Sequence, residues 1–294
     1  MSLYHPENLV PAQAELGEGP AWDAFSGLLY WVNIPAGELH IYSPATRQDI
    51  ATSVGQMIGC VAPRRGGGVV VGLRGGIATF NLDTFQLTWL AQPETHLPGN
   101  RFNDGKCDPT GRLIAGTMSI DESKPGQGSL YSIEQTGKVR TLLNPVSISN
   151  GLAWSPDLKT MYYIDTPTRQ VMAYDYDLER GTIANPRPAL CVPAELGWPD
   201  GMTADRQGML WVALWGGASL TRWDPATGRL LETVRFPALN VTSCAFGGPD
   251  GTDLYVTTAR KGMNAAQLEE YPLSGGLFRL RTGVEGQPAF AYGG

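Results

Sequence analysis

The chain has 294 residues, 42% of them hydrophobic, and a formal net charge of −6. This length suits one large domain or two ordinary ones, and the acidic balance argues against nucleic acid or an anionic membrane as a partner. No stretch reaches the roughly 20 apolar residues of a membrane span, and the N-terminus lacks the pattern of a signal peptide. We expect a cytoplasmic protein that binds neither nucleic acid nor membrane. No pattern indicates assembly, so we expect a monomer.

Cysteine and histidine usage excludes several kinds of site. There are only three histidines and no HExxH motif, so few residues are available for a zinc site built from His or for a Ser-His-Asp triad. The cysteines form no CxxC pair, and we expect buried free thiols. They are Cys60, Cys107, Cys191 and Cys244.

One short pattern recurs along the whole chain, a polar residue followed by Gly and a strand-like run. The anchor positions are Gly19, Gly59, Gly105, Gly151 and Gly201, with Ser243 in the sixth place. Their spacing of about 40 to 50 residues is typical of β-propeller blades.

Each anchor is followed by the same order of predicted elements. A first strand such as "CVAP" or "LAWS" precedes a turn rich in Asp and Gly, as in "DPTGRLIAG", and further strands such as "VMAYDYD" follow. Helical patterns are scarce apart from residues 264–271, which excludes an α/β barrel. We predict an all-β fold in which residues 1–294 form a single domain, a six-bladed β-propeller with four-stranded blades.

The first strand of each blade lines the central channel of a propeller, so residues at equivalent repeat positions form a ring. Three carboxylates and one carboxamide would meet there, where repulsion and lost hydration favour a bound cation. Oxygen ligands without Cys or His suit Ca²⁺, Mg²⁺ or Mn²⁺. Asn-Gly and Asp-Gly are also common turn pairs, but the shared register favours a metal-containing channel. The ring consists of Glu18, Ile58, Asp104, Asn150, Asp200 and Thr242.

At this point the chain resembles the SMP-30/gluconolactonase/regucalcin family. The motifs that carry the resemblance cover nearly the whole chain in order. They are "GEGPAWD", "NRFNDGKCDPTGRLIAGTM", "ISNGLAWSPD", "YYIDT", "PDGMTAD", "GMLWVALWGG" and "TSCAFGG". The resemblance implies a propeller that holds one divalent metal ion and hydrolyses a small-molecule sugar lactone to the aldonic acid.

The resemblance also implies roles for particular residues. The metal ligands would be Glu18 of "GEGP", Asn150 of "SNGL" and Asp200 of "PDGM". Arg101 and Asn103 of "RFND" would contact substrate.

A third substrate contact is implied after "AGTM", where animal members of the family carry Glu and this chain carries the shorter Asp121. The family's ligand set does not require Asp104, for which we favour a supporting role. Trp198 and Trp215 are candidates for a pocket wall.

The expected mechanism combines Lewis-acid polarisation of the lactone with proton transfer by Asp200. A metal-bound hydroxide is an alternative way to activate the nucleophile. Ca²⁺ is favoured, with Zn²⁺, Mn²⁺ and Mg²⁺ as alternatives. Two other functions stay open: hydrolysis of another ester or an organophosphate on the same scaffold, and non-catalytic calcium binding. The particular sugar lactone is left open.

Overall fold

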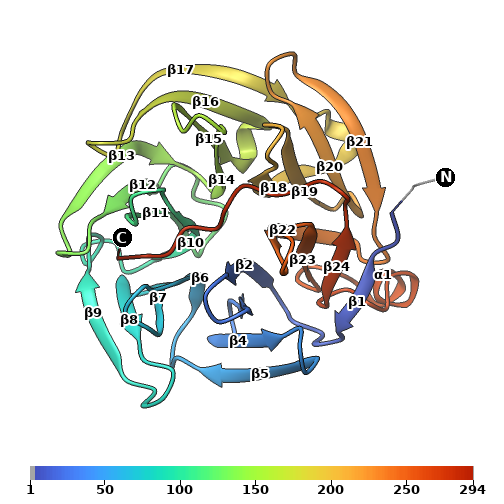
Figure 1. The fold of residues 1–294 in the computed structure, drawn as a ribbon, viewed down its shortest axis with the longest axis horizontal. Helices are drawn as coiled ribbons and strands as arrows, with labels where there is room; N and C mark the ends of the chain where they lie inside the picture. The colour runs from blue at the N-terminus through green and yellow to red at the C-terminus, as the bar shows by residue number, and fades with distance from the viewer. Residues whose placement is uncertain (1–3, 294) are drawn as a thin grey trace.

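Six four-stranded sheets surround a central axis in the computed structural model, which describes residues 4–293 (Figure 1). The prediction of an all-β, six-bladed propeller is therefore confirmed. In each blade the innermost strand lies at the channel and the others follow outward. Five blades contain four consecutive strands each: β2 (Gly17–Asp23), β3 (Leu28–Asn33), β4 (Glu38–Ser43) and β5 (Gln48–Ser53); β6 (Ile58–Pro63), β7 (Val69–Leu73), β8 (Ile77–Phe80) and β9 (Leu87–Ala91); β10 (Asn100–Cys107), β11 (Leu113–Ser119), β12 (Gly128–Ile133) and β13 (Val139–Val146); β14 (Ser149–Trp154), β15 (Thr160–Asp165), β16 (Gln170–Asp177) and β17 (Thr182–Cys191); β18 (Trp198–Ala204), β19 (Leu210–Trp215), β20 (Ser219–Asp224) and β21 (Arg229–Arg235).

The sixth blade joins the two ends of the chain. Its inner strands are β22 (Asn240–Gly247), β23 (Asp253–Ala259) and β24 (Leu277–Arg281), and its outermost strand is β1 (Glu7–Val10). The pairing of β1 with β24 is antiparallel and places Asn8 opposite Phe278. Because this pairing closes the ring, the first described strand supplies the edge that the last blade would otherwise expose.

Within residues 4–293, helical structure is confined to three short segments. The α-helix α1 (Ala265–Glu270) lies within the predicted range 264–271 and begins with a capping box on Asn264. Two 3₁₀ turns, η1 (Thr166–Thr168) and η2 (Ala194–Leu196), precede β16 and β18. Among the described residues, no helix is both long and apolar enough to cross a membrane.

The repeated polar-Gly step corresponds to a break in the pairing of every inner strand. The register shifts between Glu18 and Ala21 in β2 and between Asn150 and Leu152 in β14. Equivalent shifts occur in β6, β10, β18 and β22. A β-bulge re-aims the side chains next to it, so each inner strand changes its side-chain direction at the repeated step.

The glycines at these steps allow neighbouring blades to approach closely. A Cβ on Gly59 would lie 2.2 Å from the carbonyl oxygen of Phe102 in the next blade. A Cβ on Gly201 would lie 2.1 Å from the Ser243 hydroxyl oxygen. Since no real Cβ tolerates such distances, Gly is needed there for packing between blades.

Apolar side chains fill the spaces between successive blades. Cys60, Cys107 and Cys244 are buried there as free thiols, as predicted. Cys191 is free but exposed, so the prediction of burial is wrong for this residue. Its position at the end of the outermost strand β17, whose residues are mostly exposed, explains the difference.

Candidate functional site

A cavity of about 300 Å³ lies in the central channel at the level of the bulges. Inner strands of four blades supply the five predicted polar residues that line it, and Trp198 and Trp215 form part of its wall as expected. The five are Glu18, Arg101, Asn103, Asn150 and Asp200.

The carboxyl groups of Glu18 and Asp200 are both buried in this cavity, with each residue only 5% exposed. Burial raises the pKa of Glu18 to about 8, and repulsion from Asp104 adds to the shift. Burial also raises the pKa of Asp200 well above its ordinary value, with repulsion from Glu18 and Asp104. The Gly19 N–H donates a 3.0 Å hydrogen bond to Glu18 but does not offset these effects. The cavity thus holds two carboxyl groups whose ionisation is disfavoured by burial and mutual repulsion more than it is favoured by Arg101 nearby.

Arg101 is the buried cation of this site. Burial lowers the pKa of its guanidinium to about 10, while attraction to Glu18, Glu122 and Asp200 acts in the opposite direction. A group with this pKa is still protonated at neutral pH. Nη1 donates to the carbonyl oxygen of Phe102 at 3.0 Å and to Asn103 Oδ1 at 2.6 Å. The guanidinium is therefore held in place and keeps further N–H donors for a ligand.

Asn103 connects the predicted substrate residues with the predicted metal ligands. Its Nδ2 donates to Asn150 Oδ1 at 2.9 Å and to the carbonyl oxygen of Ser149 at 2.8 Å. Asn103 and Asn150 are both buried and belong to neighbouring inner strands, β10 and β14. The two carboxamides are thus oriented by one another.

The structure places Asp121 outside the cavity and the next residue, Glu122, on its lining. The Asp121 side chain is 51% exposed, accepts a hydrogen bond from Ser123 and forms a 3.0 Å ion pair with Lys124. Glu122 instead forms an ion pair with Lys261 from the sixth blade. After β11 the chain turns, so neighbouring side chains point in different directions. The acidic side chain available to a ligand at this rim is Glu122.

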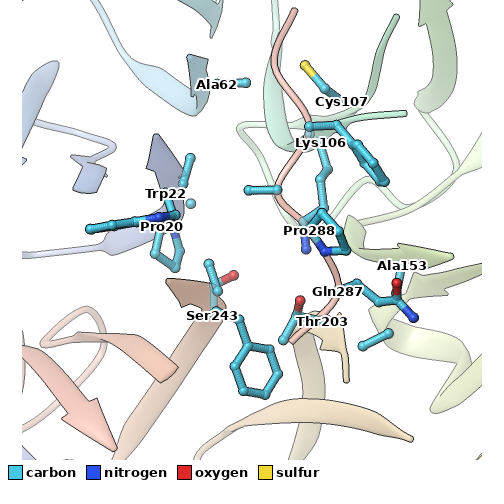
Figure 2. Close-up of a pocket in the computed structure, with 18 of the residues that line it drawn as sticks. Pro20, Trp22, Ala62, Lys106, Cys107, Ala153, Thr203, Ser243, Gln287 and Pro288 are labelled. Atoms are coloured by element: carbon cyan, nitrogen blue, oxygen red, sulfur yellow. The ribbon is translucent and has the colours of Figure 1, made fainter. Parts of the chain in front are cut away.

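Asp104 does not line this cavity but a second one, of about 70 Å³, further along the same inner strands. Its carboxylate accepts a 2.7 Å hydrogen bond from the Gly105 N–H. Lys106 also lines the second cavity and donates to the carbonyl oxygen of Met202 at 2.8 Å. Figure 2 shows Lys106 and Pro288 facing Pro20 and Trp22 across this space.

The C-terminal segment crosses the centre of the ring (Figure 1), and its residues 287–290 line the second cavity. The backbone N–H of Gln287 donates to Ala204 in the fifth blade, and that of Tyr292 donates to Pro63 in the second blade. Because this cavity is much the smaller of the two, the larger cavity, which also holds the five predicted polar residues, is the better candidate for chemistry.

The donor set of the larger cavity suits a hard divalent cation. Glu18 and Asp200 offer carboxylate oxygens and Asn150 offers a carboxamide oxygen, which is the preference of Ca²⁺ and Mg²⁺. Within residues 4–293, no group of three or more His, Cys, Asp or Glu side chains is arranged to hold a metal ion. A set of three protein ligands for a metal ion in this cavity therefore includes the carboxamide of Asn150. A cation would also relieve the repulsion that raises the pKa values of the two carboxyl groups.

Three polar lining residues were not identified from the sequence: Thr166, Glu122 and Lys261. Thr166 is the last residue of the motif "YYIDT". That motif contributed to the family resemblance, but nothing in it assigned Thr166 to the site. Glu122 and Lys261 lie in loops, whose course the strand pattern does not specify. Their recognition required the folded chain.

Comparison with known proteins places these features in a family. The family described as SMP-30/gluconolactonase/LRE-like region matches residues 16–260. The chain is 39% identical to regucalcin of Oryctolagus cuniculus over 300 residues, covering 100% of both chains. It is 40% identical to the putative sugar lactone lactonase YvrE of Bacillus subtilis (strain 168) over 273 residues, covering 92% of this chain and 93% of that protein.

A solved structure shows the same fold. The crystal structure of regucalcin from Agrobacterium tumefaciens, described as a calcium-binding protein, superimposes with a TM-score of 0.94. The two chains are 31% identical, and the match covers 98% of this chain and 97% of that one.

Proposed function

Because this chain belongs to the SMP-30/gluconolactonase/LRE-like family, we propose that it hydrolyses a sugar lactone to the aldonic acid with one divalent metal ion, Ca²⁺ in the first place. One observation carries the proposal: two buried, mutually repelling carboxyl groups and a carboxamide share a cavity with a buried Arg-Asn pair. The family includes proteins named as lactonases, and the relatives named regucalcin support a divalent metal.

The metal would be held by Glu18, Asn150 and Asp200. A divalent cation supplies Lewis-acid polarisation of a carbonyl and stabilises negative charge that develops on its oxygen. The remaining polar groups of the site belong to Arg101, Asn103 and Glu122, which would hold the sugar hydroxyls and orient the ring. The cavity of about 300 Å³ lies at the lower end of the range for small-molecule sites, which suits a monosaccharide derivative.

Asp200 would carry the proton. Its pKa is raised in the cation-free cavity, and neighbouring positive charge acts in the opposite direction and favours the ionised form. As the water oxygen bonds to the lactone carbonyl carbon, Asp200 takes one water proton. It returns that proton to the ring oxygen as the ring C–O bond breaks, and the product is the open-chain hydroxy acid.

The apolar side of the same cavity favours a second candidate function, the hydrolysis of a different ester. Leu16, Met118, Ile148 and Trp215 line it, and they would suit an ester less polar than a sugar lactone. A panel that includes aryl esters and organophosphates beside aldonolactones separates the two candidates.

The test removes metal with EDTA and follows acid release from D-glucono-1,5-lactone with a pH indicator, with the spontaneous rate subtracted. Ca²⁺, Mg²⁺, Mn²⁺ and Zn²⁺ are then added back singly. We expect activity to vanish with EDTA and return with metal. Metal binding without hydrolysis of any aldonolactone or ester in the panel would instead favour a calcium-binding protein. Full activity after metal removal would contradict the proposed metal dependence.

A further inference from the structure

Four side chains form a continuous chain of hydrogen bonds along the wall of the larger cavity. Arg101 donates to Asn103, which donates to Asn150 Oδ1 at 2.9 Å. Asn150 Nδ2 donates to Thr166 Oγ1 at 2.8 Å, and the Thr166 hydroxyl donates to the carbonyl oxygen of Pro199 at 2.8 Å. This series of hydrogen bonds therefore runs from β10 through β14 and η1 to Pro199, the residue before Asp200.

The chemistry of the groups at the two ends decides which group donates and which accepts in each hydrogen bond of this series. An Arg guanidinium can only donate, so Asn103 must turn its oxygen toward Arg101. The Ser149 carbonyl can only accept, which places the Asn103 NH₂ group on the other side.

At the far end the Pro199 carbonyl also can only accept, so the Thr166 hydroxyl gives it its single hydrogen. The remaining lone pairs of Thr166 then accept from Asn150. Both neighbours thus require the Asn150 NH₂ group to face Thr166 and its oxygen to face Asn103.

We infer that Thr166 is a positioning residue that holds the Asn150 carboxamide with its oxygen available as a cation ligand. This inference rests on the proposed metal site. A carboxamide binds a cation through oxygen and not through its NH₂ group, so its orientation decides whether Asn150 is a ligand at all. Groups that orient the ligands of a metal commonly change its affinity by about 10- to 100-fold when they are removed.

The test compares Thr166→Val, which keeps the shape of the side chain but loses the hydroxyl, with Thr166→Ser, which keeps the hydroxyl. The affinity of the EDTA-treated full chain for Ca²⁺ alone is measured by titration calorimetry, with native folding checked by circular dichroism. We expect Thr166→Val to weaken Ca²⁺ binding by about tenfold or more and Thr166→Ser to stay near wild type.

A second pair of variants separates orientation from general packing. In the Asn150→Asp background both terminal atoms of residue 150 are oxygens, so no orientation has to be maintained. We expect Thr166→Val to change Ca²⁺ affinity little in that background. An equal loss in both backgrounds would assign Thr166 a merely structural role and overturn the inference.

The outcomes also distinguish this inference from the proposed function. Wild type that binds Ca²⁺, together with a Thr166→Val variant that binds it equally well, removes only the role of Thr166. Wild type that binds none of the divalent ions removes the metal site and the inference with it.

Discussion

Glu122 and Lys261 form an ion pair at the rim of the larger cavity, joining the loop after β11 to the loop after β23. Both side chains are partly exposed, 48% for Glu122 and 37% for Lys261. The pair therefore lies where a substrate would enter, with Arg101 deeper in the cavity.

Glu122→Gln is expected to raise the KM for D-glucono-1,5-lactone by about tenfold, because a hydrogen bond to a charged group contributes about 1.5–3 kcal/mol. Asp121→Asn is the matched control, since it changes the neighbouring carboxylate that points away from the cavity. Steady-state kinetics on both variants checks this. The reverse pattern, with KM raised only by Asp121→Asn, would return the substrate contact to Asp121.

Asp200→Asn is expected to lower kcat by about 10²- to 10⁴-fold, the usual contribution of a positioned proton-transfer group. The carboxamide keeps the size of the side chain, so circular dichroism should show a native fold. Turnover near wild type in the folded variant would remove Asp200 from proton transfer. Calcium titration of the same variant reports its separate role as a ligand.

Stability of the EDTA-treated protein is expected to fall as pH rises from about 5 to 8. The pKa of Glu18 is about 8 in the folded protein and 4.5 ordinarily, so between these values the folded state holds more protons than the unfolded state. The free energy of unfolding then decreases with rising pH. The raised pKa of Asp200 acts in the same direction.

Thermal melts over this range, with and without excess Ca²⁺, provide the measurement. Calcium should restore most stability at the alkaline end, because it binds the folded state and favours ionised carboxylates. Glu18→Gln should flatten the pH slope of the EDTA-treated protein. A slope that is unchanged by this substitution would show that Glu18 does not titrate in this window.

Asp205→Ala is expected to lower the free energy of unfolding by about 3–5 kcal/mol without altering the cavity. The Asp205 carboxylate is fully buried and accepts hydrogen bonds from Arg222 Nε at 2.9 Å and Trp211 Nε1 at 3.1 Å. Its loss removes the fully buried partner of the Arg222 guanidinium and leaves Glu232 as the remaining carboxylate partner. Chemical denaturation measures the effect, and unchanged Ca²⁺ affinity of the folded variant would confirm that Asp205 is structural.

Much of this molecule follows from local chemistry and could be predicted. The recurring polar-Gly step has the period of a blade, and strand patterns of short range follow each step. Equivalent positions in a repeat must lie at equivalent places around the axis, so Glu18, Asn150 and Asp200 were expected to converge. All three line one cavity.

Other features depend on contacts between segments far apart in the chain. The strand β1 pairs with β24 because the ring has to close, which no local pattern specifies. Asp104 occupies the same repeat position as Asp200 yet faces the second cavity. The bulge of β10 contains Asn103 and Asp104, whereas the bulge of β18 contains Asp200 and Gly201, so the two carboxyl groups lie at different places in their bulges.

By itself, the sequence determined the number of blades, the level of the polar ring and the residue types available to bind a cation, because these depend on periodicity and composition. Only the tertiary structure decided that Glu122 and not Asp121 reaches the cavity, and that Thr166 meets Asn150. Loop course and side-chain direction are set by packing and by hydrogen bonds between blades. Such interactions come into existence only when the ring has closed.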